Sequence, residues 1–154
     1  MHEHKPAQEI MPMREEHATH SMLMGYVLWI FGFIGAHRFY FGKQVTGVIW
    51  FLTFGLFFIG WIIDLLLIPS MARQADTRFE PGRVNYSVAW VLLTFLGPLG
   101  LHRFYMGKIW TGLLFLAASG VFIVIPFAAA IIVVGLLYDF LTLNEQLSDI
   151  NSRT

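Results

Sequence analysis

Two aspartates, Asp64 and Asp139, are the residues whose type and position most suggest chemistry in this chain. Each lies inside a strongly apolar stretch, GWIIDLLLI around the first and GLLYDFLTL around the second. A carboxylate within a membrane segment is costly and by default marks a functional site. The pair predicts either a cation or proton site, or structural carboxylates that bond a neighbouring helix or nearby arginines. Because no third polar group accompanies them, we favour the structural role.

A basic and aromatic motif precedes each aspartate. Its two copies consist of His37, Arg38, Phe39, Tyr40, Gly42 and Lys43, and of His102, Arg103, Phe104, Tyr105, Gly107 and Lys108. The arginines suit a helix C-terminus or an aromatic ring, or with the lysines an anionic lipid headgroup. The histidines could cap the same helix end, sense pH or bind metal, although two ligands rarely make a metal site. The Phe and Tyr rings suit the membrane interface.

The spacing argues against an ion pair between the two features of one copy. Asp64 follows Gly47 by 17 residues, about 25 Å of helix. We therefore expect Asp64 to lie near the opposite membrane face from Arg38, without an Asp–Arg bridge inside one hairpin.

Glycines flank both copies of the motif. Four of them lie one helical turn apart in pairs and would leave a helix face free of side chains, at Gly32, Gly35, Gly97 and Gly100. Such faces let membrane helices approach closely. Gly42 and Gly107 are expected to supply left-handed turn residues between spans.

Composition identifies the elements that must position these residues as membrane helices. The chain has 154 residues, of which 56% are hydrophobic and 13% charged, against about 25% charged in an average soluble domain. The formal net charge of zero removes the case for a nucleic-acid partner. The absence of cysteine excludes disulfides and thiol chemistry. No catalytic set, metal cluster or phosphate-binding loop is present, so we expect neither an enzyme nor a cofactor.

Four apolar runs are candidate spans, at 22–36, 45–68, 86–101 and 109–143. The fourth has 35 residues and would measure about 52 Å as one helix, against a hydrocarbon core of about 30 Å. Gly120 and Pro126 are poor residues for a helix interior. We therefore predict a break or strong kink between Ser119 and Ala128.

The chain contains an internal repeat. Residues 32–47, GFIGAHRFYFGKQVTG, and residues 97–112, GPLGLHRFYMGKIWTG, are identical at ten of sixteen positions, and the second copy has ten extra residues before its aspartate. The predicted fold is an all-α integral membrane protein whose four transmembrane helices form two tandem hairpins, with the fourth helix kinked or broken. The predicted segments are a polar tail at 1–21, hairpins at 22–69 and 86–144, a polar linker at 70–85 and a C-terminal tail at 145–154.

The doubled pattern Gly-x-x-Gly-x-His-Arg-Phe-Tyr-x-Gly-Lys, followed by an aspartate late in the next apolar run, resembles the two-transmembrane domain (TM-2) family. The resemblance covers residues 22–69 and 86–144. Eukaryotic members often have Asp-Arg-Phe in this loop, so the His-Arg-Phe of this chain is closer to the bacterial pattern. The resemblance implies an integral membrane protein and carries no established reaction with it.

The N-terminal tail and the topology give two further expectations. The tail holds possible copper or nickel ligands, His2, His4, Met11, Met13, His17 and His20, but a disordered polar leader interrupted by prolines is favoured. The motif loops are expected on one membrane face, with the linker and terminal cations on the other. The count of cations favours cytoplasmic termini, in a multi-pass protein of a bacterial inner membrane.

The function favoured by these observations is a non-enzymatic membrane scaffold or interaction protein. Its partners would be the lipid bilayer and other membrane proteins or a second copy of itself. The alternative is a small proton or cation transporter or channel that uses Asp64 and Asp139.

Overall fold

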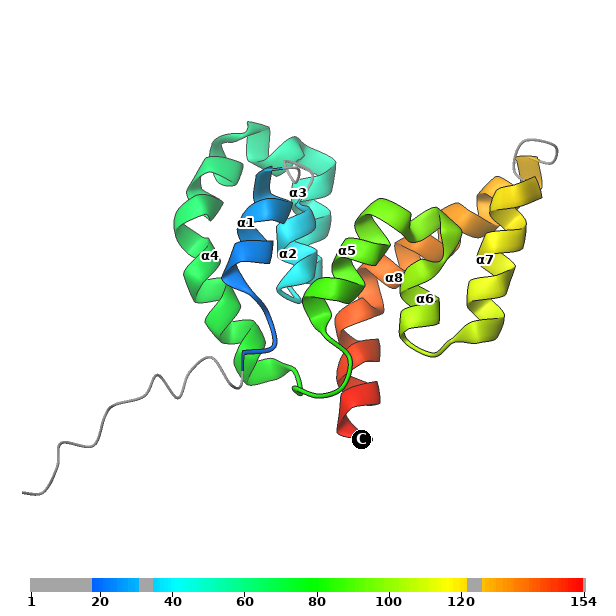
Figure 1. Ribbon diagram of the computed structural model, residues 1–154. Helices are drawn as coiled ribbons and strands as arrows, with labels where there is room; N and C mark the ends of the chain where they lie inside the picture. Colours follow the sequence, from blue (N-terminus) through cyan, green and yellow to red (C-terminus); the bar gives the residue numbers. More distant parts are fainter. Residues whose placement is uncertain (1–17, 31–34, 122–125, 154) are drawn as a thin grey trace, which may run out of the picture.

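A computed structural model describes residues 18–30, 35–121 and 126–153, and all regular structure in these ranges is helical. The first half of the chain forms α1 (Met22–Ile30), α2 (Ala36–Tyr40), α3 (Gln44–Phe57) and α4 (Ile59–Arg78). The second half forms α5 (Tyr86–Leu96), the short 3₁₀-helix η1 (Gly97–Leu99), α6 (Leu101–Tyr105), α7 (Ile109–Val121) and α8 (Pro126–Ser152). The halves stand side by side (Figure 1) and have the same order of long and short helices. We call them the first and second repeat.

The first two predicted spans are not single helices. Within 22–36, α1 ends at Ile30 and α2 begins at Ala36. Within 45–68, the backbone of α3 becomes left-handed at Phe54, and a left-handed Phe58 separates α3 from α4. Left-handed residues turn the chain out of a right-handed helix, and α4 consequently folds back along α3. Length and hydropathy gave no sign of these turns because the residues around them are as apolar as the helices.

The fourth apolar run is interrupted as predicted. α7 ends at Val121 and α8 begins at Pro126, where the absent N–H of proline costs a helix nothing. The two helices pack against each other. The ten extra residues of the second repeat therefore lengthen a helical hairpin.

Two segments predicted to be polar connections are largely helical. α4 continues through Pro69 to Arg78, and α8 continues to Ser152. The first half of the predicted 70–85 linker and most of the predicted C-terminal tail therefore extend the preceding helices. Among the described residues, one helical segment, Ala128–Ser152, has the length and apolar composition to cross a membrane. Shorter apolar helices cover Gln44–Phe57, Tyr86–Leu99 and Ile109–Gly120, so four membrane-crossing helices are not established.

The main core lies in the seam between the repeats. α8 packs on α5 and also contacts α2 of the first repeat. Trp90 and Tyr40 are fully buried there. Asn144 fastens the seam: its Oδ1 accepts from Trp90 Nε1 at 2.7 Å, and its Nδ2 donates to the carbonyl of Tyr40 at 2.7 Å. A buried amide with its bonds satisfied fixes how two helices align.

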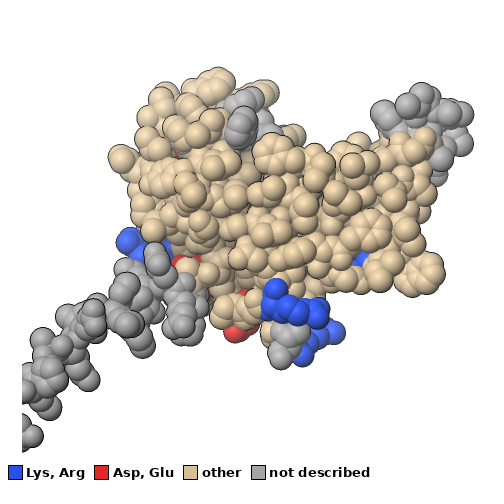
Figure 2. Space-filling view, viewed as in Figure 1, with Lys and Arg blue, Asp and Glu red and all other residues tan. Residues whose placement is uncertain are grey.

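Charged side chains gather at one end of the molecule, the lower edge in Figure 2. The motif loops lie at this same end: Lys43 Nζ donates to Gln74 Oε1 near the end of α4 at 2.7 Å, and Lys108 donates to Gln146 near the end of α8. The expectation that motif loops and linker cations lie on opposite faces is therefore wrong. It assumed that each motif ends a full span, whereas α2 and α6 carry the chain back toward its starting end.

Candidate functional site

Asp64 lies at the centre of a buried cluster in the first repeat. Its Oδ2 accepts from His37 Nε2 at 2.7 Å and from Arg38 Nε at 2.8 Å, and its Oδ1 accepts from the other side of the Arg38 guanidinium. The side chains of Asp64 and His37 are 0% exposed and that of Arg38 is 9% exposed. A two-pronged Arg–carboxylate pair of this kind is geometrically specific.

The second repeat builds the same cluster. Asp139 Oδ2 accepts from His102 Nε2 at 2.7 Å and from Arg103 Nε at 2.8 Å. Here Nε and Nη2 of Arg103 both contact Oδ2 of Asp139, and Gln146 Nε2 lies 3.4 Å from Oδ1. Because an ionised carboxylate only accepts hydrogen bonds, Nε2 of each imidazole carries the proton. We refer to the two clusters as the His–Arg–Asp triads.

The triads overturn the expectation that no Asp–Arg bridge forms within a hairpin. That expectation treated residues 45–68 as one straight helix, which would have carried Asp64 to the far face. The turn between α3 and α4 instead returns the chain, so that Asp64 lies beside α2. Each aspartate is thus paired inside its own repeat, as the structural role requires.

An aromatic ring covers each arginine. The Arg38 guanidinium carbon lies 3.6 Å from the ring centroid of Trp50, and that of Arg103 lies 4.3 Å from the ring centroid of Phe115. Stacking on a Phe or Tyr ring was one of the roles expected for these arginines; Arg103 stacks on a Phe, whereas Arg38 stacks on a Trp. The rings in fact come from α3 and α7, at the same 65-residue offset as the motif. Each triad therefore ties three helices of its repeat together.

Gly35 and Gly100 make room for the triads. Both have positive φ, 85° and 72°, at the start of the short motif helix. A Cβ on Gly35 would lie 2.8 Å from Trp50 Cβ, and one on Gly100 would lie 2.7 Å from Phe115 Cβ. These glycines therefore pack inside their own repeat, instead of forming a helix face toward another hairpin or a partner.

The other flanking glycines divide into three cases. Gly97 has right-handed helical geometry and faces Leu136 of α8, in keeping with close helix approach. Gly42 and Gly107 have φ of 72° and 78°, as expected of left-handed turn residues. Gly32 lies outside the described residues.

The aromatic motif residues have different surroundings in the two repeats. Phe39 and Tyr40 are buried in the seam and not at a membrane interface, because α5 and α8 of the second repeat cover α2. Tyr40 hydroxyl pairs with Ser87 Oγ at 2.8 Å. Phe104 is half-buried, and Tyr105 is 37% exposed and accepts from the Asn85 backbone N–H.

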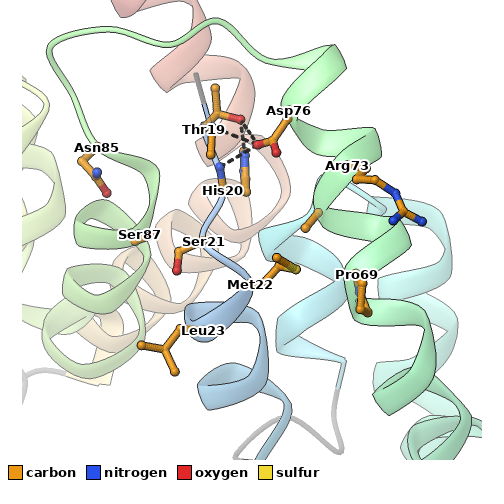
Figure 3. Close-up of a pocket in the computed structure, with 12 residues that line it drawn as sticks. Thr19, His20, Ser21, Met22, Leu23, Pro69, Arg73, Asp76, Asn85 and Ser87 are labelled. Atoms are coloured by element: carbon orange, nitrogen blue, oxygen red, sulfur yellow. Dashed lines mark hydrogen bonds between the residues drawn. The ribbon is translucent and has the colours of Figure 1, made fainter. Parts of the chain in front are cut away.

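A hollow of about 690 Å³, with both polar and apolar lining residues, lies beside the starts of α1 and α5 and the last turns of α4 (Figure 3). Asp76 Oδ1 accepts from the backbone N–H groups of Thr19 and His20 at 2.9 and 3.0 Å. Arg73 extends away from this bonded corner. Burial lowers the pKa of His20 to about 4, opposed by the nearby charge of Asp76. Asp76 therefore ties the chain entering α1 to α4.

No metal site emerges among the described residues, where no group of three His, Asp or Glu side chains is placed to hold an ion. Each motif histidine instead bonds its own aspartate. The expected tail ligands His2, His4, Met11, Met13 and His17 lie outside the described residues. His20 lies beside Thr19, whose Oγ is 2.8 Å from its Nδ1.

Sequence reasoning missed Trp50, Phe115, Asn144 and His20 as parts of these clusters. The matching offset of Trp50 and Phe115 was a usable signal, because an aromatic residue follows the arginine by twelve positions in both copies. Asn144 carried no such signal, because at the 75-residue offset of the aspartates the first repeat has Pro69.

Comparison with known proteins finds relatives of this chain. Three similar proteins are TM2 domain-containing proteins of Dictyostelium discoideum, 43%, 46% and 41% identical over 61, 54 and 55 residues. These matches cover 39%, 34% and 35% of this chain and 40%, 39% and 34% of the relatives. The chain thus matches well under half the length of these relatives, and they lend no support to a bacterial origin.

No solved structure matches the chain significantly. The family model described as the TM2 domain matches residues 18–66 and 82–140, one segment in each repeat and most of the chain. The matched segments contain both His–Arg–Asp triads, and the chain belongs to the TM2 domain family.

Proposed function

We propose that this protein is a non-enzymatic membrane scaffold or interaction protein. The observation that carries the proposal is that the aspartates of both apolar runs are engaged by an arginine and a histidine of their own repeat. A neutralised, hydrogen-bonded carboxylate holds helices together at the depth where an isolated charge would be costly. The motif then serves to build a rigid body.

The surface of the repeats supports a membrane setting. Large apolar side chains are exposed on all the longer helices. Examples are Leu23, 75% exposed on α1, Leu66, 81% on α4, Phe95, 57% on α5, and Trp110, 85% on α7. Contiguous apolar surface of this kind marks contact with lipid or with another protein. On the face seen in Figure 2, the exposed charged side chains gather at one end, as expected of a body whose apolar part lies in lipid and whose polar end lies at the interface.

A proton or cation transporter is the less favoured function. It needs a carboxylate that can exchange its partner for an ion, but each aspartate already accepts bonds from two cationic or imidazole side chains. Breaking a buried pair by taking away one partner costs about 3–5 kcal/mol. Ion binding at Asp64 or Asp139 would have to offset that loss.

Two measurements on the full chain separate these functions. A photo-crosslinking amino acid at exposed Trp110 should give a discrete product in native membranes, either a dimer or one defined membrane protein. The same probe at fully buried Trp90 is the matched control and should give none. In proteoliposomes the wild type should conduct protons or cations no faster than empty vesicles. Flux that disappears in a folded Asp139→Asn variant would establish transport instead.

A further inference from the structure

An apolar groove runs along the seam between the repeats. It encloses about 380 Å³ and is lined by α2 and α3 on one side and α8 on the other, including Val48, Phe51, Val133, Leu137 and Phe140. Every lining residue is apolar. Val133 and Leu137 are each 55% exposed, so the groove opens to the surroundings of the protein.

One end of the groove is closed by polar groups. Gln44 Nε2 donates to Glu145 Oε1 at 2.8 Å. Gln44 lies one helical turn from Val48, and Glu145 lies one turn from Leu141, which also lines the groove. The groove therefore begins at the charged end of the molecule and leads into its apolar part.

This polar end holds two cations with different partners. Arg78 pairs with Glu145 at 3.1 Å and also donates to the Gly42 carbonyl at 2.7 Å. Lys43, next along the chain, bonds the neutral amide of Gln74 and has no carboxylate within ion-pair distance among the described residues. Glu80 and Asp149 line the same hollow as Arg78 and Glu145, so Arg78 lies among carboxylates. Lys43 is therefore the cation at this end that is left for an anionic headgroup.

The size of the groove favours a thin occupant. An α-helix about 10 Å across would fill 380 Å³ in roughly one turn, so a partner helix would mostly lie outside it. An acyl chain is unbranched and much narrower. We propose that the groove binds one acyl chain of an anionic phospholipid, whose phosphate lies at Lys43. This inference rests on the membrane setting of the proposed function and is independent of the scaffold role.

Native mass spectrometry of the detergent-solubilised full chain tests the site, with phosphatidylglycerol and phosphatidylcholine as probes. The wild type should retain one phospholipid and prefer phosphatidylglycerol. Val133→Trp fills the groove and should lose the bound lipid, whereas Val134→Trp, one position along α8 and outside the groove, should keep it. Leu137→Trp is a second filling variant in case the first does not fold.

The charge of the mouth is tested by two equivalent lysines. Lys43→Gln should reduce the preference for phosphatidylglycerol about fivefold. Lys108→Gln removes the corresponding cation of the second repeat, away from the groove, and should leave the preference unchanged.

Equal lipid retention by the folded Val133→Trp and Val134→Trp variants would overturn the proposal. A wild-type dimer that is lost in Val133→Trp while lipid retention stays intact would also overturn the proposal, because the groove would then hold a second copy of the chain. Crosslinking from Trp110 reports on the scaffold role separately.

Discussion

The two repeats hold their aspartates alike but fasten their outer helices differently. In both, His, Arg and Asp form a buried triad under an aromatic ring. In the first repeat, the rings of Trp29 and Trp61 stack 4.5 Å apart, and each indole donates to the other residue's carbonyl, joining α1 to α4. In the second repeat, Trp90 and Asn144 join α5 to α8. The triads, which both repeats share, hold each repeat together. The tryptophan contacts, which differ between the repeats, join the outer helices in a different way in each.

The aromatic half of the motif shows the same division. Tyr40 is completely buried by the second repeat, whereas Tyr105, its counterpart, is 37% exposed. The repeats are similar in sequence at this point, so the difference comes from what packs against them. The seam is therefore asymmetric: it covers the motif helix of the first repeat and leaves that of the second partly open.

The largest effects should come from breaking the triads. Asp64→Ala leaves Arg38 and His37 buried without their acceptor and should lower the free energy of unfolding by about 3–5 kcal/mol. Asp139→Ala should cost a similar amount, because its triad has the same partners. Unfolding in mixed detergent micelles measures both. Asp149→Ala is the control: its ion pair with Arg153 is exposed and should contribute less than about 1 kcal/mol. Unequal costs for the two triad variants would break the equivalence of the repeats.

Acid sensitivity should arise in the first repeat. Burial lowers the pKa of His20 to about 4 from an ordinary value of 6.5, so the unfolded chain takes up a proton first. The contribution of neutral His20 to the free energy of unfolding should be fully present above pH 6.5. It should fall by up to about 3 kcal/mol as the pH drops to 4. The second repeat has Asn85 at the equivalent position. His20→Asn should remove this part of the pH dependence, and an unchanged pH profile of unfolding would refute the assignment.

Substitution of the two turn glycines by alanine should destabilise the protein unequally. Gly42 and Gly107 have nearly the same positive φ, which costs a substituted alanine about 1–2 kcal/mol. A Cβ on Gly42 would also lie 2.6 Å from the buried ring of Phe79, whereas one on Gly107 meets nothing within 4 Å. Gly42→Ala should therefore destabilise more than Gly107→Ala by about 1 kcal/mol. Thermal unfolding in detergent is the measurement, and equal losses would contradict the packing.

The smallest expected difference lies between the motif tyrosines. Tyr40→Phe removes a buried hydroxyl that pairs with Ser87 Oγ and should cost about 1–1.5 kcal/mol. Tyr105→Phe removes an exposed acceptor, which water can replace, and should cost about 0.5 kcal/mol or less. Equal costs, measured by unfolding in the same detergent, would mean that the seam does not bury Tyr40.

Much of the local organisation could be predicted from sequence. The repeat, the apolar stretches, the interruption before Pro126 and the left-handed glycines at 42 and 107 all depend on features that composition and spacing record directly. Favouring a structural role for Asp64 and Asp139 depended on the lack of further polar partners nearby in sequence. The doubled motif was also enough to predict the TM2 domain family.

The pairing within each triad could not be predicted, because it depends on where the chain turns. Residues 54–58 are four aromatic or leucine residues and one glycine, and nothing in their hydropathy separates a turn from a helix. Without that turn, Asp64 is placed about 25 Å from Gly47 and out of reach of Arg38. The burial of Tyr40 was missed for a related reason: it depends on contact with α5 and α8, from the other half of the chain.

A set of double-mutant cycles tests the central claim, that each aspartate is held by the arginine of its own repeat. The cycles combine Arg38→Met with Asp64→Asn, and Arg103→Met with Asp139→Asn, with unfolding free energies measured in mixed micelles. Each should show a coupling of at least about 1.5 kcal/mol. The crossed cycle of Arg38→Met with Asp139→Asn should be additive within about 0.5 kcal/mol. Additive own-repeat cycles, or strong coupling in the crossed cycle, would contradict the account.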